Sequence, residues 1–194
     1  MKTTKSFLLL IIVTASFFFA CKKHKDESQG GQITQATNLV NNYSFEQYSA
    51  CPDNETQIER AKGWFKSVGD ADYYNACSSG PWSVPPNTYG NYQLAATGNA
   101  FAGLIVYVSS IGSLEIIHTQ LSSPLSIGTK YYTSFKVSCS NKNIAVNKLG
   151  AKFTIGSMPL IDNSAQVFTN TIISDTMNWV PVSGSFIADS AYTT

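Results

Sequence analysis

Charge and histidine are scarce in this 194-residue sequence. Asp, Glu, Lys and Arg make up 13% of the residues, with 13 basic against 12 acidic side chains, and only two histidines occur. A nucleic-acid-binding protein would show a basic stripe, and none is visible, so we expect no nucleic-acid partner. Long apolar patterns with helical spacing are also absent, which excludes a helical bundle.

Residue combinations typical of catalysis are missing as well. The histidines are His24, in a polar segment, and His118, in an expected strand, and no serine lies in a nucleophile-elbow sequence. The carboxylates lie mostly in loops, and a glycosidase would need two of them about 5–9 Å apart in a cleft. We therefore expect a protein that is not an enzyme.

The N-terminus has the pattern of a secretory signal. Lys2 and Lys5 precede a run from Phe7 to Ala20 that is apolar apart from Thr14 and Ser16. This run is shorter than the roughly 20 residues that a permanent membrane-spanning helix needs, and it fits the apolar core of a signal peptide.

The end of that run resembles a lipobox. In Phe18-Phe19-Ala20-Cys21 a small residue precedes the cysteine, although Phe18 replaces the usual aliphatic residue. The resemblance implies cleavage of residues 1–21 as a lipoprotein signal peptide, with Cys21 acylated and holding the chain on a membrane. The alternatives are a signal peptide with an incidental cysteine and an uncleaved anchor.

Residues 22–36 are expected to form a flexible tether. The charged run Lys22–Glu27 resembles the signal that directs Bacteroidota-type lipoproteins to the outer face of the outer membrane, the alternative being an ordinary solvated cluster. The following Ser, Gln, Gly and Thr residues cannot bury enough apolar surface to fold. We therefore expect an outer-membrane, cell-surface location, with a tether reach on the order of 20 Å.

Residues 37–194 have the size and pattern of one all-β domain. Short runs of Val, Ile, Thr, Tyr and Phe alternate with Gly, Pro, Asn and Ser clusters, and only Glu55–Lys62 looks helical. The expected strands are Asn38–Glu46, Ala100–Val108, Leu114–Leu121, Lys130–Ser140, Lys148–Ile155, Ala165–Thr171 and Trp179–Ile187. This spacing predicts an antiparallel β-sandwich or jelly roll.

The last expected strand, Trp179–Ile187, is followed by only seven residues. A sandwich ending there would expose an unpaired strand edge, which natural proteins usually avoid. We therefore expect a C-terminally incomplete domain that lacks its last strand. A free-standing domain with Trp179–Ile187 at its edge is the alternative.

Three cysteines remain beyond Cys21. Cys51 and Cys77 lie in polar, turn-rich loops, whereas Cys139 shares a predicted strand face with Phe135 and Val137. In an exported protein we therefore pair Cys51 with Cys77 and assign Cys139 to the core. The disulfide would close a loop of about 27 residues and contribute on the order of 3.5 kcal/mol. A zinc site is the competing interpretation, but the spacing fits none.

The order of several short motifs resembles a known family. They are Asn38–Glu46, Cys51-Pro52, Ala61–Trp64, Asp72–Cys77, Val84–Asn87, Gly90, Gln93, Gly98–Gly103, Leu121–Leu125, Gly128–Tyr131 and Ser134–Val137. This order resembles N-terminal galactose-binding-like or carbohydrate-binding-like jelly-roll modules of Bacteroidota-type surface lipoproteins, often linked to OmpA-type or gliding-associated proteins. In the same comparison Tyr192–Thr194 would begin the closing strand.

The resemblance also implies a role for Glu46. In sandwiches that open with a similar Phe-Glu ending, the glutamate helps to bind a structural calcium ion, which prefers hard oxygen ligands. The alternative is a glutamate that caps a turn or accepts hydrogen bonds from nearby backbone. Calcium at Glu46 is thus the one cofactor that the resemblance implies.

Sugar recognition combines aromatic faces with amides and carboxylates. The segment from Gly63 to Tyr92 is rich in these groups, and Trp82 lies among turn-forming residues, so it is the best candidate for an exposed platform. The candidate ligand-binding residues are Trp82, Tyr74, Tyr89, Tyr92 and Asn87. The alternative is that these aromatic side chains only fill the core and cover the disulfide loop.

We therefore predict a lipid-anchored, cell-surface binding module for carbohydrate or glycoconjugate. The alternative is a structural or adhesion lipoprotein whose sandwich spaces a downstream peptidoglycan-binding domain. A third hypothesis is the non-catalytic N-terminus of a larger hydrolase.

Overall fold

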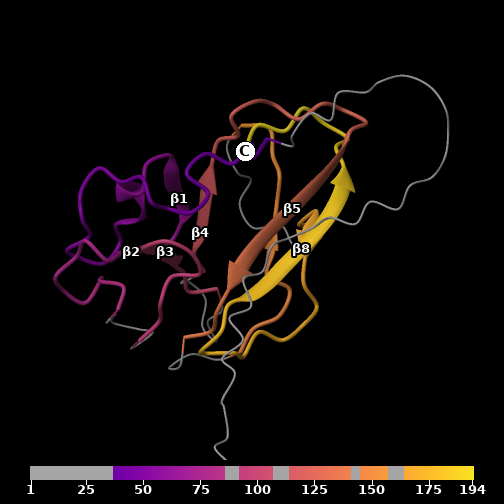
Figure 1. Ribbon diagram of the computed structural model, residues 1–194. Helices are drawn as coiled ribbons and strands as arrows, with labels where there is room; N and C mark the ends of the chain where they lie inside the picture. The colour runs from indigo at the N-terminus through magenta and orange to yellow at the C-terminus, as the bar shows by residue number, and fades with distance from the viewer. Residues whose placement is uncertain (1–36, 86–91, 107–113, 141–144, 157–163) are drawn as a thin grey trace, which may run out of the picture. The chain divides into compact units, whose positions relative to one another are not determined.

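The computed structural model describes residues 37–85, 92–106, 114–140, 145–156 and 164–194. Thr37–Thr194 form one compact unit (Figure 1). The predicted signal peptide, Cys21, the tether, Asn87 and Tyr89 lie outside the described residues. Within the described ranges, no helix has the length and apolar character needed to cross a membrane.

The described chain is built from antiparallel strand pairs. The elements are η1 (Ile58–Arg60), β1 (Trp64–Val68), β2 (Asp72–Asn75), β3 (Ala100–Gly103), β4 (Ile116–Thr119), β5 (Lys130–Val137), β6 (Gly150–Ala151), β7 (Val167–Phe168) and β8 (Val180–Ile187). They pair as β1–β4, β2–β3, β5–β8 and β6–β7. The predicted all-β, antiparallel class is confirmed, and the jelly-roll arrangement of the sheets stays a prediction.

β5 and β8 form the longest pair and lie side by side over eight residues each (Figure 1). Exposed and half-buried side chains alternate along β5, with Phe135 and Val137 on the inner face and Lys136 on the outer one. This is the alternation that the sequence predicts. On the inner side Phe186 of β8 packs on Phe153, with ring centroids 4.8 Å apart. Cys139 follows β5 as a half-buried thiol that is not part of a disulfide.

β2 is covered on both faces. Tyr73 is 0% exposed and Tyr74 is 3% exposed. Tyr73 packs in a cluster with Ala61 and Ala100, whereas Tyr74 stacks on Phe101 of β3, with ring centroids 4.9 Å apart. Both adjacent tyrosines of this strand are therefore buried. A strand that is buried on both faces shows no alternation of apolar and polar residues, so β2 was not predicted from the sequence. β1 was not predicted either.

The predicted opening strand Asn38–Glu46 is mostly a turn. Val40 forms a single bridge with Leu121, and Asn42 and Phe45 then adopt positive φ angles of 47° and 63°. The Asn42 side-chain amide donates to the carbonyls of Gln47 (2.8 Å) and Lys62 (2.9 Å). Asn tolerates this backbone conformation because its side chain can form such local bonds.

The other predicted elements are shorter than expected. The helical segment Glu55–Lys62 contains only the single 3-10 turn η1. The predicted strands Lys148–Ile155 and Ala165–Thr171 shrink to the two-residue strands β6 and β7. Val167 of β7 lies against Gly184 of β8, where an added Cβ would approach the valine to 3.1 Å.

Residues 192–194 lie between two segments that are distant in sequence. The N–H groups of Leu121 and Leu125 donate to the carbonyls of Thr193 and Tyr192, both at 2.9 Å. On the other side, Thr154 exchanges backbone hydrogen bonds with Thr193 and Thr194. This is the place in the chain where the sequence predicts the start of a closing strand.

We predict that Tyr73→Phe lowers the free energy of unfolding by about 1–3 kcal/mol. The buried hydroxyl donates to the Phe45 carbonyl (2.8 Å) and accepts from Asn75 Nδ2 (2.7 Å), so its removal leaves both groups unsatisfied. Tyr132, which is 71% exposed, is the matched control, and its Phe variant should stay within about 0.5 kcal/mol. Urea denaturation measures both, and equal effects would contradict the proposed role of the buried bonds.

Candidate functional site

A disulfide joins two loops of the described chain. Cys51 precedes η1, Cys77 follows β2, and their Cα atoms are 5.6 Å apart. The predicted pairing is confirmed. The bond covalently fixes the segment around Pro52 and Asp53 beside the segment from Ser78 to Gly80.

Arg60 holds the first of these loops in place. Its guanidinium donates to the Cys51 carbonyl through Nη1, and Nη2 lies 2.8 Å from Asp53 Oδ1. Gln57 Nε2 donates to the same oxygen (2.9 Å), and Gln57 Oε1 accepts from the N–H groups of Asp53 and Asn54. One arginine and one glutamine therefore fix both the backbone and the carboxylate of this loop.

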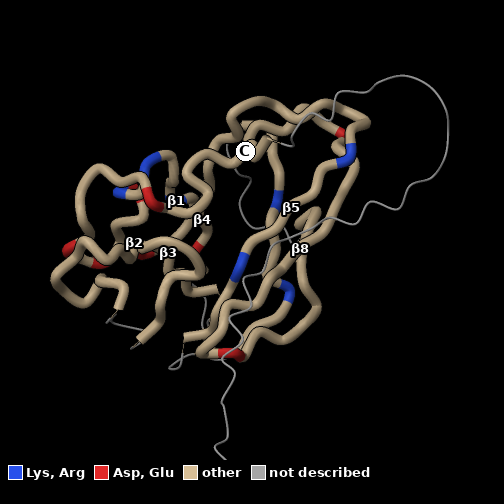
Figure 2. Tube along the Cα trace, viewed as in Figure 1, with Lys and Arg blue, Asp and Glu red and all other residues tan. Residues whose placement is uncertain are grey.

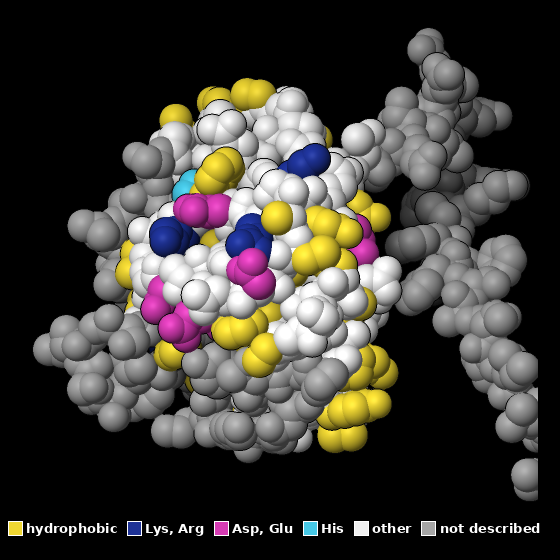
Figure 3. Space-filling model, turned by 90° about the vertical axis from the view of Figure 1, so that its left-hand side faces the viewer, with side chains coloured by type: hydrophobic (Ala, Val, Ile, Leu, Met, Phe, Trp, Pro, Cys, Tyr) yellow, Lys and Arg dark blue, Asp and Glu magenta, His cyan; other side chains and the backbone are white. Residues whose placement is uncertain are grey.

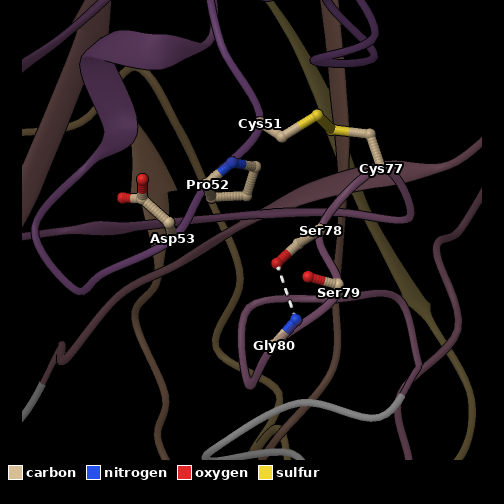
Figure 4. Close-up of a pocket in the computed structure, with 7 residues that line it drawn as sticks. All are labelled: Cys51, Pro52, Asp53, Cys77, Ser78, Ser79 and Gly80. Carbon is tan, nitrogen blue, oxygen red and sulfur yellow. Dashed lines mark hydrogen bonds between the residues drawn. A yellow bond between two sulfur atoms is a disulfide. The ribbon is translucent and has the colours of Figure 1, made fainter.

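The two loops enclose a pocket of about 340 Å³ (Figure 4). It is lined by Cys51, Pro52, Asp53, Cys77, Ser78, Ser79 and Gly80. The hydroxyls of Ser78 and Ser79 point toward the side on which Pro52 and Asp53 lie. Ser78 Oγ also accepts a hydrogen bond from the Gly80 N–H (3.2 Å), which closes the turn.

The pocket presents hydrogen-bonding groups rather than a nucleophile with a base. Hydrogen bonds from Gln57 and Arg60 lower the pKa of Asp53, so this exposed carboxylate stays ionised at neutral pH. Both bonds use Oδ1, and neither Asp53 Oδ2 nor the Ser79 hydroxyl bonds to a described residue. An ionised acceptor and a free hydroxyl suit a small polyhydroxylated ligand.

The predicted ligand-binding aromatic residues do not form one surface. Tyr74 lies in the core, so its assignment to a ligand surface is corrected, whereas Tyr92 is 73% exposed. Trp82 is half-buried, its carbonyl accepts from the Asn75 N–H (3.1 Å), and its buried indole N–H has no partner among the described residues. Trp82 is therefore not the fully exposed platform that its turn-forming neighbours predicted.

The structure instead brings together an aromatic row that the sequence analysis missed. Phe101 stacks on Tyr74 and meets Trp179 edge-on, with ring centroids 5.6 Å apart. The Trp179 indole N–H donates to the Leu94 carbonyl (2.8 Å). This row ties the β2–β3 pair to the segment before β8, and it serves packing.

Glu46 caps a turn, which is the alternative considered for it. Its Oε1 accepts from the Asn99 N–H (2.8 Å) and lies where a Cβ on Gly98 would be 2.3 Å away. Gly98 also has a φ of +65°, so both the backbone conformation and the lack of space for a Cβ require glycine there. Among the described residues, no three His, Cys, Asp or Glu side chains gather closely enough to hold a metal ion.

His118 pairs with a serine across two strands. Ser67 Oγ of β1 lies 2.6 Å from His118 Nδ1 of β4, and Phe65 packs beside the imidazole at 5.5 Å. A catalytic serine–histidine pair also needs a group that orients the imidazole. In the described chain no carboxylate is hydrogen-bonded to His118. The pair therefore carries only part of a catalytic arrangement.

Two acidic residues lie where β1 ends and β4 begins: Asp70 follows β1, and Glu115 precedes β4. Glu115 is 6% exposed, accepts from the Ile105 N–H through Oε2 (2.7 Å), and shares a side-chain hydrogen bond with Asp70. Burial, followed by the neighbouring carboxylates Asp70 and Asp72, raises the pKa of Glu115 to about 7. Gly69 (φ +74°) allows this approach, because a Cβ there would lie 2.5 Å from Glu115 Cγ. Burial also raises the pKa of Asp72.

No protein-family model, curated protein or solved structure significantly matches the chain.

We predict that the stability of the protein falls as pH rises from about 4.5 to about 7, and that Glu115→Gln removes most of this fall. In this window the folded state keeps the Glu115 proton that the unfolded state has already lost. The stabilisation is complete below the unfolded pKa and is lost as pH rises through the folded one. The difference between variant and parent should reach on the order of 2 kcal/mol.

Urea titrations at several pH values measure this effect. Asp70→Asn serves as a second variant, because removal of its charge should move the upper end of the window to lower pH. Parallel stability curves for the parent and Glu115→Gln would contradict the assignment.

Proposed function

We propose that this chain is a lipid-anchored, non-catalytic binding module of the bacterial cell surface whose ligand is a carbohydrate or glycoconjugate. The observation that carries the proposal is the disulfide-bounded pocket, with Asp53, Ser78 and Ser79 around the ring of Pro52. The order of sequence motifs that resembles carbohydrate-binding-like jelly rolls supports the same class.

The chemistry of the pocket matches that of a sugar. Asp53 Oδ2 accepts hydrogen bonds from ligand hydroxyls, and the Ser79 hydroxyl donates or accepts as the ligand requires. Pro52 is fully buried and forms the base beneath these polar groups, so Asp53 and Ser79 make the contacts with the ligand. A volume of about 340 Å³ is at the lower end of the range for small-molecule sites and holds one or two sugar rings at most.

The pocket is also held in shape before any ligand arrives. The disulfide joins its two walls, and Arg60 and Gln57 fix the acidic wall. Binding therefore costs little conformational entropy. This low cost is the usual source of affinity in a small preformed site.

We expect Asp53→Asn to weaken glycan binding at least tenfold and Ser79→Ala about threefold or more, because hydrogen bonds to charged groups contribute most. Ser123→Ala, an exposed serine outside the pocket, is the control and should bind within twofold of the parent. A glycan array identifies the ligand, and isothermal titration then measures each variant.

The same experiment separates the proposal from its alternative. Asp53 is exposed, so its variant should melt close to the parent, and a loss of binding then reports on the pocket. If the parent binds no glycan on the array, the carbohydrate proposal fails and the structural-lipoprotein hypothesis is favoured.

The membrane anchor makes a separate prediction at Cys21. Expression in a lipoprotein-processing bacterium with a labelled fatty acid should label the parent and place it in the membrane fraction. Cys21→Ser should lose the label, because the thiol that receives the acyl chain is gone. Cys139→Ser, which removes a thiol from the folded unit, should keep it. Labelling of Cys21→Ser would overturn the lipoprotein assignment.

A further inference from the structure

The outer face of the β5–β8 pair presents eight exposed side chains. β5 contributes Lys130, Tyr132, Ser134 and Lys136, and β8 contributes Pro181, Ser183, Ser185 and Ile187. Tyr132 is 71% exposed and lies directly across from Ser185, and Ser134 lies across from Ser183. No described segment covers this face, because all eight positions are exposed.

The charge on this face is of one sign. Neither strand contains an acidic residue, and the only charged residues of the two strands are Lys130 and Lys136. Blue segments of the trace lie along β5 in Figure 2. Among the described residues the one salt bridge joins Arg60 to Asp53, so neither lysine is paired. On the face shown in Figure 3, by contrast, basic and acidic side chains lie next to one another.

The spacing along β5 suits an extended polymer. Lys130 and Lys136 are six residues apart on one strand, which corresponds to about 20 Å. The exposed ring of Tyr132 and the serine hydroxyls lie between the two positive ends. A ligand that follows the strand would meet a charge, an aromatic ring, hydroxyl groups and a second charge in that order.

We infer that the outer face of β5–β8 is a second binding surface, for an anionic linear polysaccharide such as a polyuronate. The lysines bind carboxylates of the polymer, Tyr132 packs against a sugar ring, and the three serines bond to ring hydroxyls. A single-stranded nucleic acid would need several stacking aromatic side chains, and this face has one. The surface shares no residue with the disulfide pocket and goes beyond the function proposed for it.

The test uses polygalacturonate as the anionic probe and dextran as the neutral one, with the full chain, by affinity electrophoresis and titration calorimetry. The parent should bind polygalacturonate at about 20 mM NaCl, lose most of this binding at about 500 mM, and bind dextran in neither case. The Lys130→Gln/Lys136→Gln double variant should lose at least tenfold in affinity, and Tyr132→Ala about fivefold.

The matched control is Lys62→Gln/Lys66→Gln, which removes the same net charge from exposed positions outside this face. It should bind polygalacturonate within twofold of the parent. An equal loss in the two lysine double variants would overturn the surface in favour of general charge attraction. No binding by the parent would also overturn it, without bearing on the pocket.

Discussion

A buried relay of hydrogen bonds connects the core of this protein to its candidate binding pocket. The Tyr73 hydroxyl, inside the core, accepts from Asn75 Nδ2, and Asn75 Oδ1 in turn accepts from the Cys77 N–H (2.9 Å). Cys77 is bonded to Cys51, whose carbonyl accepts from Arg60. Arg60 also pairs with Asp53, so this series of contacts links a tyrosine that is fully shielded from solvent to the acidic wall of the pocket.

Some parts of this structure were visible in the sequence, and others were not. β5 is half-buried, so its alternation could be read directly, and the pairing of Cys51 with Cys77 followed from the loop character of both segments. β2 has no such alternation, because both of its faces are covered. The opening segment carries strand-like residues, but the positive φ angles of Asn42 and Phe45 convert it into a turn. Local patterns do not report that kind of tertiary constraint.

The candidate site was predictable to the same partial degree. The two cysteines were identified, but Asp53, Ser78 and Ser79 were not, although each lies within two residues of a cysteine. Their proximity to the disulfide was the available signal. The aromatic candidates failed for a different reason: composition cannot decide whether a tyrosine such as Tyr74 stacks inward on Phe101 or faces solvent. Exposure is set by the pairing of β2 with β3, and the sequence predicts the strand that contains Phe101 but neither β2 nor this pairing.

The disulfide also determines when the pocket can exist. In a reducing compartment the segments of Pro52 and Ser79 are joined only through non-covalent contacts, and thiols there remain unpaired. Reduction of the Cys51–Cys77 bond would therefore leave the two walls of the pocket without their covalent link. If the chain is exported as proposed, the two walls become joined only after it reaches an oxidising compartment. The oxidation state of the Cys51–Cys77 pair would thus indicate which compartment the chain has reached.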